Sequence, residues 1–135
     1  MQFASDGRPL PSPTPVSQPF FDGARRRELM LQRCPRDGFF HYPRSRCPDC
    51  LGDDWSWEKA SGRGELHAFT IDRIGHDPAL SSRIPFAIGV VELEEGPRMT
   101  ANIVGCELED LRVGMALKVE FEDVDETTLV RFTPR

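Results

Sequence analysis

Residues 34–52 read CPRDGFFHYPRSRCPDCLG and contain three of the four cysteines of the chain. The second of two short turns in this stretch, CPDC at 47–50 followed by a glycine, has the spacing at which two thiolates face one metal ion. The first turn, CPRD at 34–37, has the same spacing with a carboxylate in place of the second thiolate. We call these turns the first and second knuckles. They predict a zinc ribbon whose ligands are Cys34, Asp37, Cys47 and Cys50.

Two alternatives to this ligand set stay open. His41 is a substitute fourth ligand, although its spacing fits the turn less well. The ribbon could also have lost its metal and be held by packing alone. A redox function for the second knuckle would need a thioredoxin-like βαβ context, which the sequence lacks. A zinc ion with four protein ligands has no open coordination position, so we expect its role to be structural.

Downstream of the knuckles, residues 64–135 show the alternation of apolar and polar residues that is typical of strands. The five predicted strands are 64–74, 85–93, 98–104, 117–124 and 127–132. A stretch long enough for one helical turn, residues 107–114, separates the third strand from the fourth. This order is that of a five-stranded OB-fold barrel. The competing interpretation is a six-stranded or SH3-like barrel.

Upstream of the knuckles, the sequence PFFDGARRRELMLQ at 19–32 predicts a short helix from about Gly23 to Leu31, with Asp22 as its N-cap. Its apolar residues must dock on something, either its own domain or a partner protein. Residues 1–18 are polar and rich in proline, which predicts a disordered tail or a linker. We therefore divide this mainly β chain into three parts, namely 1–18, a helix with the zinc ribbon at 19–63, and the OB-fold at 64–135.

Charge and composition exclude several classes of protein. The net charge of the 135 residues is −5, with a sum of +2 over residues 19–63 and of −7 over residues 64–135. No apolar run is long enough to span a bilayer, and the N-terminus lacks the order of a signal peptide, so we expect a cytoplasmic protein. The three histidines and the short glycine motif at 62–64 suggest no catalytic or phosphate-binding constellation.

Several motifs resemble one known family. They are ELMLQRC at 28–34, FFHYPR at 39–44, SGRGE at 61–65, VVELEEGPR at 90–98, NIVGC at 102–106 and DLRVGM at 110–115. In this order they resemble acyl-CoA-associated proteins that join a rubredoxin-like zinc ribbon to an OB-fold, a family long known only as a domain of unknown function. The resemblance covers about residues 19–135. The first knuckle of that family normally has two cysteines, and Asp37 departs from this pattern.

The resemblance implies a non-catalytic partner of a thiolase-superfamily enzyme acting on acyl-CoA, such as a thiolase, a lipid-transfer-type enzyme or a steroid side-chain aldolase. Some relatives are fused behind a MaoC-like hydratase domain, and residues 1–18 would suit such a linker. A CoA ester would then bind together with the partner. Chemistry alone makes Arg44 and Arg46 candidates for the CoA phosphates, and Phe20, Phe21 and Leu29 candidates for the partner interface.

The alternative function is that of a single-stranded nucleic-acid-binding protein, because both OB-folds and zinc ribbons bind nucleic acid in other proteins. The charge of −7 over residues 64–135 argues against it, since such proteins need a basic groove. The arginine-rich stretch between residues 25 and 46 is where this activity would be sought.

Overall fold

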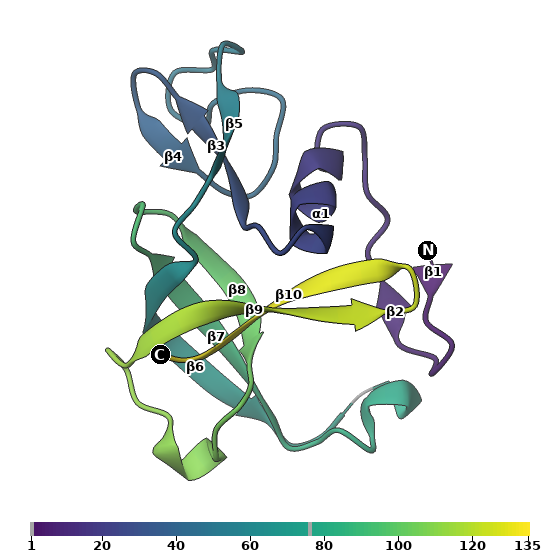
Figure 1. Ribbon diagram of the computed structural model, residues 1–135. Helices are drawn as coiled ribbons and strands as arrows, with labels where there is room; N and C mark the ends of the chain where they lie inside the picture. The colour runs from purple at the N-terminus through teal and green to yellow at the C-terminus, as the bar shows by residue number, and fades with distance from the viewer. Residues whose placement is uncertain (1, 76) are drawn as a thin grey trace.

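A closed barrel occupies the C-terminal half of the computed structural model, which describes residues 2–75 and 77–135 (Figure 1). His76, one of the three histidines, lies outside the described residues. The strands of the barrel are β6 (Arg63–Asp72), β7 (Phe86–Leu93), β8 (Arg98–Ile103), β9 (Ala116–Val124) and β10 (Thr127–Pro134). A 3-10 helix, η1 (Pro78–Leu80), follows β6, and a second one, η2 (Leu108–Asp110), lies between β8 and β9. The five predicted strands are confirmed, with no bound shifted by more than two residues.

The barrel has the strand order β10-β8-β7-β6-β9. Strand β10 pairs with β8 in parallel and with β9 antiparallel, while all other pairs are antiparallel. This closure is that of an OB-fold. The competing six-stranded or SH3-like barrel is therefore not the fold of the described residues.

Large side chains fill the interior of the barrel. Leu66, Leu117 and Phe132 are fully buried. Gly89 faces this interior, where a Cβ atom would lie 2.8 Å from Cδ1 of Leu66 and 2.9 Å from the side chain of Ile103. Alternation along each strand puts these residues inside and polar residues outside, as the period of two dictates.

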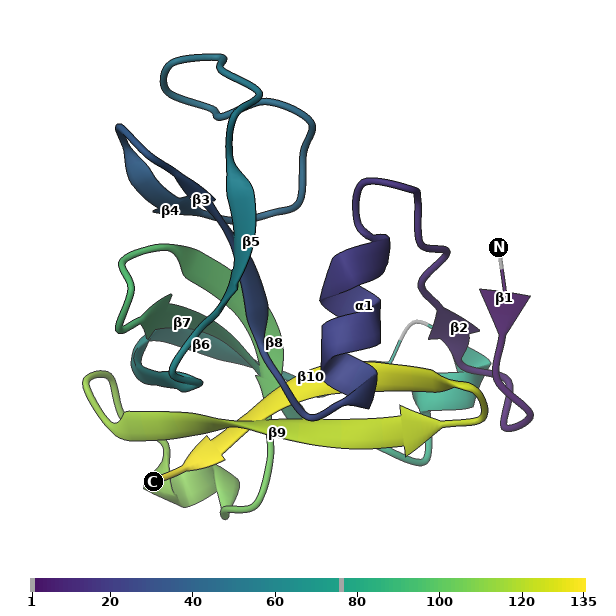
Figure 2. The ribbon, with the colours of Figure 1, turned by 45° about the horizontal axis from the view of Figure 1, so that its top comes forward.

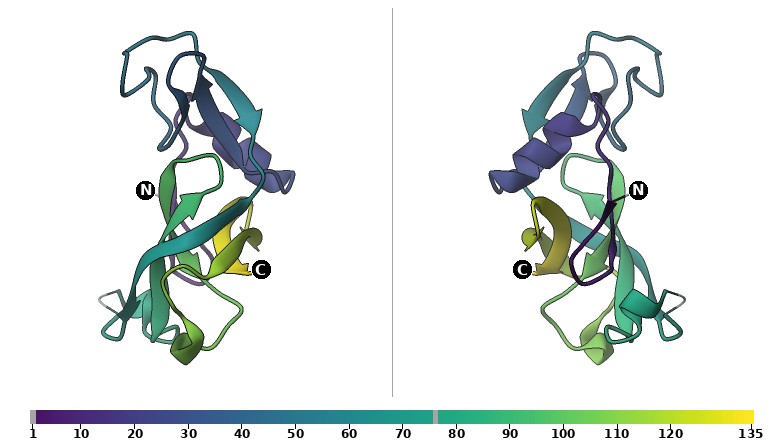
Figure 3. Two further views of the ribbon diagram at one scale, coloured as in Figure 1. Left: turned by 90° about the vertical axis from the view of Figure 1, so that its left-hand side faces the viewer. Right: turned by 90° about the vertical axis from the view of Figure 1, so that its right-hand side faces the viewer.

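The zinc-ribbon region forms a separate three-stranded sheet above the barrel (Figure 2). Its strands are β3 (Met30–Cys34), β4 (Gly38–Phe40) and β5 (Ser56–Lys59), in the order β4-β3-β5. Residues 60–62 connect β5 directly to the first barrel strand. Seen from the side, the ribbon lies at one end of the molecule and the barrel at the other (Figure 3).

The helix α1 (Gln18–Arg25) lies earlier in the chain than predicted. Ser17 precedes it, Pro19 lies in its first turn, and the backbone of Arg27 adopts a left-handed conformation (φ 66°) that ends it. The prediction of a helix from Gly23 to Leu31 with Asp22 as N-cap was wrong. Met30 and Leu31 begin β3 and Leu29 directly precedes it, because burial of alternate side chains suits a strand there.

Residues 2–17, for which a tail or linker is expected, pack onto the barrel. The short strands β1 (Gln2–Phe3) and β2 (Pro9–Leu10) pair antiparallel. Ala4 and Leu10 are buried against Val124. Ser5 donates two hydrogen bonds, from its backbone nitrogen and its Oγ, to the carboxylate of Asp125 at 2.7 and 2.9 Å. A few polar anchors at the hairpin turn therefore hold a segment whose composition alone indicates disorder.

No helix among residues 2–75 and 77–135 has the length and apolar character needed to cross a membrane.

Candidate functional site

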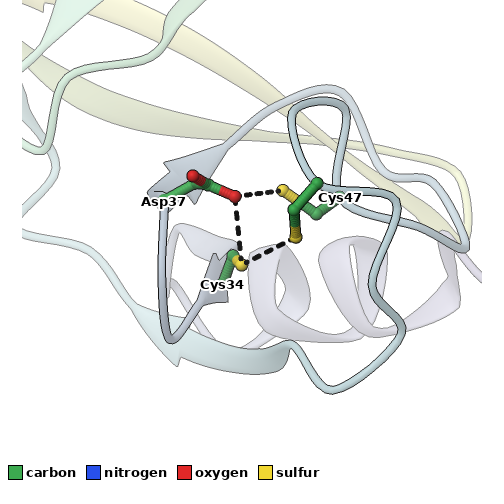
Figure 4. Close-up of side chains that lie close together, drawn as sticks. Cys34, Asp37 and Cys47 are labelled. Atoms are coloured by element: carbon green, nitrogen blue, oxygen red, sulfur yellow. Dashed lines mark hydrogen bonds between the residues drawn. The ribbon is translucent and has the colours of Figure 1, made fainter.

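The four residues of the two knuckles converge at one end of the ribbon. One ligand atom from each of Cys34, Asp37, Cys47 and Cys50 lies within 4.8 Å of the others. The Sγ atom of Cys34 lies 3.7 Å from that of Cys50, and Oδ2 of Asp37 lies 3.6 Å from Cys34 Sγ and 3.4 Å from Cys47 Sγ (Figure 4). Cys34 and Cys47 are buried, whereas Asp37 and Cys50 are exposed.

These distances fit the edges of a zinc tetrahedron. Zinc–sulfur bonds of about 2.3 Å and zinc–oxygen bonds of about 2.1 Å imply sulfur–sulfur edges near 3.8 Å and sulfur–oxygen edges near 3.6 Å. The three measured distances, 3.7, 3.6 and 3.4 Å, lie close to these values. The donor set, three sulfurs and one carboxylate oxygen, is one that zinc accepts. The residues present therefore fit a structural zinc ion.

Backbone N–H groups face the first cysteine of each knuckle in the same way. Burial raises the pKa of the Cys34 thiol, but the backbone N–H groups of Arg36 and Asp37 outweigh it, so that pKa is lowered. In the second knuckle the backbone N–H groups of Asp49 and Cys50 face Cys47 in the same way. Amide groups that donate to ligand sulfurs orient the ligands and stabilise the thiolates.

The pKa values of the cluster divide between its members. The pKa of Asp37 is lowered by hydrogen bonds from Cys50 first and then from Cys47. The backbone N–H of Cys50 lowers the pKa of the Cys47 thiol, yet burial and the neighbouring Cys34 and Asp37 raise it to about 11. The lowered pKa values of Asp37 and Cys34 favour their charged forms, and a cation bound by the cluster would stabilise those forms further.

An arginine beside the cluster was missed by sequence reasoning. Arg36 donates to Sγ of Cys50 at 3.4 Å and pairs with both carboxylate oxygens of Asp54, one of them at 2.9 Å. The hydrogen bond to Asp54, followed by that to Cys50, raises the pKa of Arg36. Gly52 leaves room for this side chain, because a Cβ atom there would lie 2.5 Å from Nη2 of Arg36. The sequence shows that this stretch is rich in arginine, but it does not show that Arg36 contacts the sulfur of Cys50.

His41, the alternative fourth ligand, is not a member of the cluster. Its ring packs, tilted by 39° in each case, against the rings of Phe20, at 5.5 Å between centroids, and Tyr42, at 4.2 Å. Burial and the nearby charge of Arg44 lower the pKa of His41 to about 4. The imidazole therefore belongs to the contact between the ribbon and α1.

The two candidate CoA-binding arginines lie on the loops around the second knuckle. Arg44 Nε donates to the carbonyl oxygen of Tyr42 at 3.1 Å, and Arg46 Nη1 donates to that of Leu51 at 3.1 Å. Buried Gln32 fixes the backbone of Arg44, donating to its carbonyl oxygen at 2.7 Å and accepting from its N–H at 2.9 Å. Both arginine side chains remain exposed.

The three candidate interface residues do not share one environment. Leu29 is 2% exposed and Phe20 is 9% exposed, and both belong to the main core of the chain. Phe21 is half-buried, with its ring edge-on to that of Phe20 at 5.2 Å. Of the three, Phe21 thus retains the most surface for a partner.

Comparison with known proteins supports both halves of the fold. Residues 21–56 match the family described as "ChsH2, rubredoxin-like zinc ribbon domain", and residues 57–122 match "ChsH2, C-terminal OB-fold domain". A "DUF35 domain-containing scaffold protein" of Methanocaldococcus jannaschii is 31% identical over 100 residues, which are 73% of this chain and 70% of that protein.

Two further relatives carry enzyme names. A "probable enoyl-CoA hydratase alpha subunit" of Thermomonospora curvata is 31% identical over 129 residues, 94% of this chain. The chain spans only 40% of the length of that protein. The "benzoylsuccinyl-CoA thiolase subunit BbsA" of Thauera aromatica is 31% identical over 74 residues, 54% of this chain and 49% of that one.

A solved structure matches almost the whole chain. It is described as "Ltp2-ChsH2(DUF35) aldolase", and the matched chain superposes with a TM-score of 0.81 at 29% identity, covering 93% of this chain and 98% of that one. The two family models together, and the structural match, span both the ribbon and the barrel. The chain is a member of the DUF35 family, built from a rubredoxin-like zinc ribbon and an OB-fold domain of the ChsH2 type.

Proposed function

We propose that this chain is a non-catalytic partner, as a subunit or as a domain, of a thiolase-superfamily enzyme that acts on acyl-CoA by thiolysis or retro-aldol cleavage. The observation that carries this proposal is the match, at a TM-score of 0.81, to a chain of an aldolase that is described by two components. The partner would supply the reacting groups, and this chain would stabilise the complex and help to shape the CoA channel. Steroid side-chain degradation is one setting for such an aldolase.

The names of the relatives support an accessory role and leave the type of partner open. One relative is named a scaffold protein and another a thiolase subunit. The hydratase relative is much longer than this chain, so a MaoC-like hydratase domain is a second type of partner. All three names point to assemblies rather than to a free-standing enzyme.

A structural zinc ion would support this role from within the ribbon. When bound, the ion would cross-link the two knuckles through Cys34, Asp37, Cys47 and Cys50. The loop at 41–46 lies between the knuckles in the sequence, so the cross-link would fix both of its ends. That loop carries Arg44 and Arg46.

Arg44 and Arg46 are our proposed contacts to the CoA phosphates. One hydrogen bond from each guanidinium to a backbone carbonyl holds the side chain in place and leaves other N–H groups of the fork for an anion. Preorganised arginines lose less entropy on binding phosphate than free ones would. Phe21 is the proposed anchor at the partner interface.

The test is a pull-down of the tagged chain from its native cell at moderate salt, followed by mass spectrometry and by assays of the eluate and of the isolated chain. We expect stoichiometric recovery of a thiolase-superfamily enzyme or a hydratase, with acyl-CoA turnover in the complex and none in the isolated chain. Turnover by the isolated chain, or recovery of nucleic acid and ribosomal proteins alone, would refute the proposal.

A second arm tests the CoA contacts in the purified complex. The double variant Arg44→Glu, Arg46→Glu should raise the KM for the acyl-CoA at least about tenfold, because two charge-assisted contacts are lost, while the complex still forms. The matched control is Arg112→Glu, an exposed arginine near η2. Equal KM values for the double variant and the control would show that Arg44 and Arg46 do not contact the CoA phosphates.

A further inference from the structure

A pocket of about 330 Å³, which shares no residue with the cysteine cluster, lies between the N-terminal hairpin, the loop that carries η1, and the barrel strands β7 to β10. Figure 1 shows β1 and β2 beside the turn that joins β9 to β10, which forms one side of this region. The hydrogen bonds of Ser5 to Asp125 hold the hairpin there. The volume is within the range, about 300 to 1,000 Å³, that small-molecule sites occupy.

On the polar side of the pocket, two arginines form ion pairs with the same carboxylate, that of Glu122. Arg8 Nη1 lies 3.2 Å from one oxygen of Glu122, and Arg131 Nε lies 3.2 Å from the other. The side chains of Arg8 and Arg131 are only 11% and 19% exposed. Because these two side chains are largely buried, solvent screens their electrostatic interactions less than it screens those of surface arginines.

The charges around the pocket do not balance. Arg83, a third lining arginine, lies 3.4 Å from Asp6, which also pairs with Arg8 at 2.9 Å. Three guanidinium groups therefore face two carboxylates, leaving one positive charge. Within residues 2–75 and 77–135, the Nη2 groups of Arg8 and Arg131 donate no hydrogen bond to a protein atom. The pocket thus has both a charge and donors for one monoanion.

The remaining wall of the pocket is apolar. Leu80 from η1, Phe86 from β7 and Ile103 from β8 line it, and the exposed lining is mainly apolar. Strands β7 and β8 are the second and third strands of the barrel, whose face binds ligands in other OB-folds. A hydrated inorganic anion would leave this wall unused. An anion with a short hydrocarbon tail would fill it and remove apolar surface from water.

We propose that this pocket binds a small carboxylate with a short apolar chain, with the carboxylate on the Nη2 groups of Arg8 and Arg131 that Glu122 does not occupy and the chain against Phe86 and Ile103. Nothing in the proposed partner role requires this second site, and the isolated chain is sufficient to test it. The two proposals can therefore fail independently.

The experiment is a titration of the isolated, zinc-loaded, ¹⁵N-labelled chain with hexanoate, followed by NMR chemical-shift changes of backbone amides. We expect saturable shifts confined to the amides around the pocket, with a dissociation constant in the millimolar range that suits a ligand of about eight heavy atoms. Two control ligands separate the contributions of charge and apolar chain: hexan-1-ol has the chain without the charge, and inorganic phosphate has charge without the chain. Each should bind at least about tenfold more weakly than hexanoate. No saturation by hexanoate, or equal binding of either control, would overturn the proposal.

Variants locate the site. Arg131→Gln should weaken hexanoate binding at least about tenfold, and Arg83→Gln, at a more exposed position, should weaken it by a smaller factor. Arg98→Gln is the matched control, because Arg98 forms a single ion pair with Glu92 outside the pocket. If Arg131→Gln disturbs the fold, Arg83→Gln still decides the question. Unchanged affinity in Arg83→Gln, or an equal loss in Arg98→Gln, would place the binding elsewhere.

Discussion

Asp37 has the same relationship to Cys34 that Cys50 has to Cys47. Each is the last residue of a four-residue turn whose first residue is a buried cysteine that faces backbone N–H groups of its own turn. Oδ2 of Asp37 lies 3.4 Å from Sγ of Cys47, so the carboxylate completes the cluster across the two turns. A knuckle can therefore keep its geometry when a carboxylate replaces its second thiolate.

The first prediction is that Asp37→Ala lowers the zinc content of the chain and that Asp37→Cys does not. Alanine removes one of four ligands, whereas cysteine restores the sulfur donor that zinc accepts readily. The measurement is the molar ratio of zinc to chain after dialysis against a chelator. His41→Ala is the control and should keep its metal, since His41 packs against Phe20 outside the cluster. Full zinc retention in Asp37→Ala would identify water or another residue as the fourth ligand.

A second prediction concerns Gln32, which is 1% exposed and holds the loop that carries Arg44 by two hydrogen bonds. Gln32→Leu should destabilise the chain by about 2 kcal/mol, because it leaves two backbone groups of Arg44 without their partner. Urea denaturation with zinc in excess measures this change. Gln18→Leu, which removes an exposed hydrogen bond to Asp22 on α1, is the control and should cost less than about 0.5 kcal/mol. Equal costs would show that Gln32 does not fix the loop.

A third prediction concerns the ion pair between the end of α1 and β9. Hydrogen bonds from Arg27 first and then from Thr128 lower the pKa of Asp123 from its ordinary value of 3.8 to about 2. This carboxylate therefore contributes stability above about pH 4 that is lost as the pH falls through 2. Asp123→Asn should lower the Tm at pH 5, and its difference from the wild type should shrink towards pH 2.

Asp125→Asn is not a suitable control, because Asp125 holds Ser5. Asp53→Asn, an exposed acidic residue, is used instead. A pH-independent difference would show that charge is not the cause.

The barrel could be predicted from the sequence because its strands are amphipathic and its turns are short. Alternation of apolar and polar residues marks 64–74 and 117–124 directly, and the Asp125-Glu126 pair marks a hairpin turn. The helix could not be placed so well. The apolar residues at 29–31 suit a helix or a strand equally, and pairing of β3 with both β4 and β5 decides in favour of the strand.

The spacing of the knuckles was enough to identify the four converging residues, because ligand geometry is local in sequence. Contacts that join distant segments had no such signal. The pairing of Arg36 with Asp54, the burial of His41 against Phe20 and the docking of Arg8 on Glu122 all depend on the tertiary fold. The N-terminal hairpin shows the same limit, since a few anchors outweigh a composition that indicates disorder.

The final prediction is that His41 makes the stability of the chain depend on pH below neutrality. Burial, followed by the charge of Arg44, lowers the pKa of His41 from its ordinary value of 6.5 to about 4. Between these values the unfolded chain binds a proton that the folded chain does not, so stability is full above about pH 6.5 and falls as the pH drops to 4. The loss attributable to His41 is at most about 3 kcal/mol.

His41→Phe keeps an aromatic ring against Phe20 but cannot titrate. Its free energy of unfolding should therefore fall less than that of the wild type between pH 7 and 4.5, by about 2 kcal/mol. Urea denaturation at both pH values gives this difference, from which acid release of zinc cancels because both proteins share it. His67→Gln, at an exposed position of β6, should follow the wild type. If His41→Phe also follows the wild type, the imidazole is protonated in the folded chain and its contact with Phe20 does not exclude the charge.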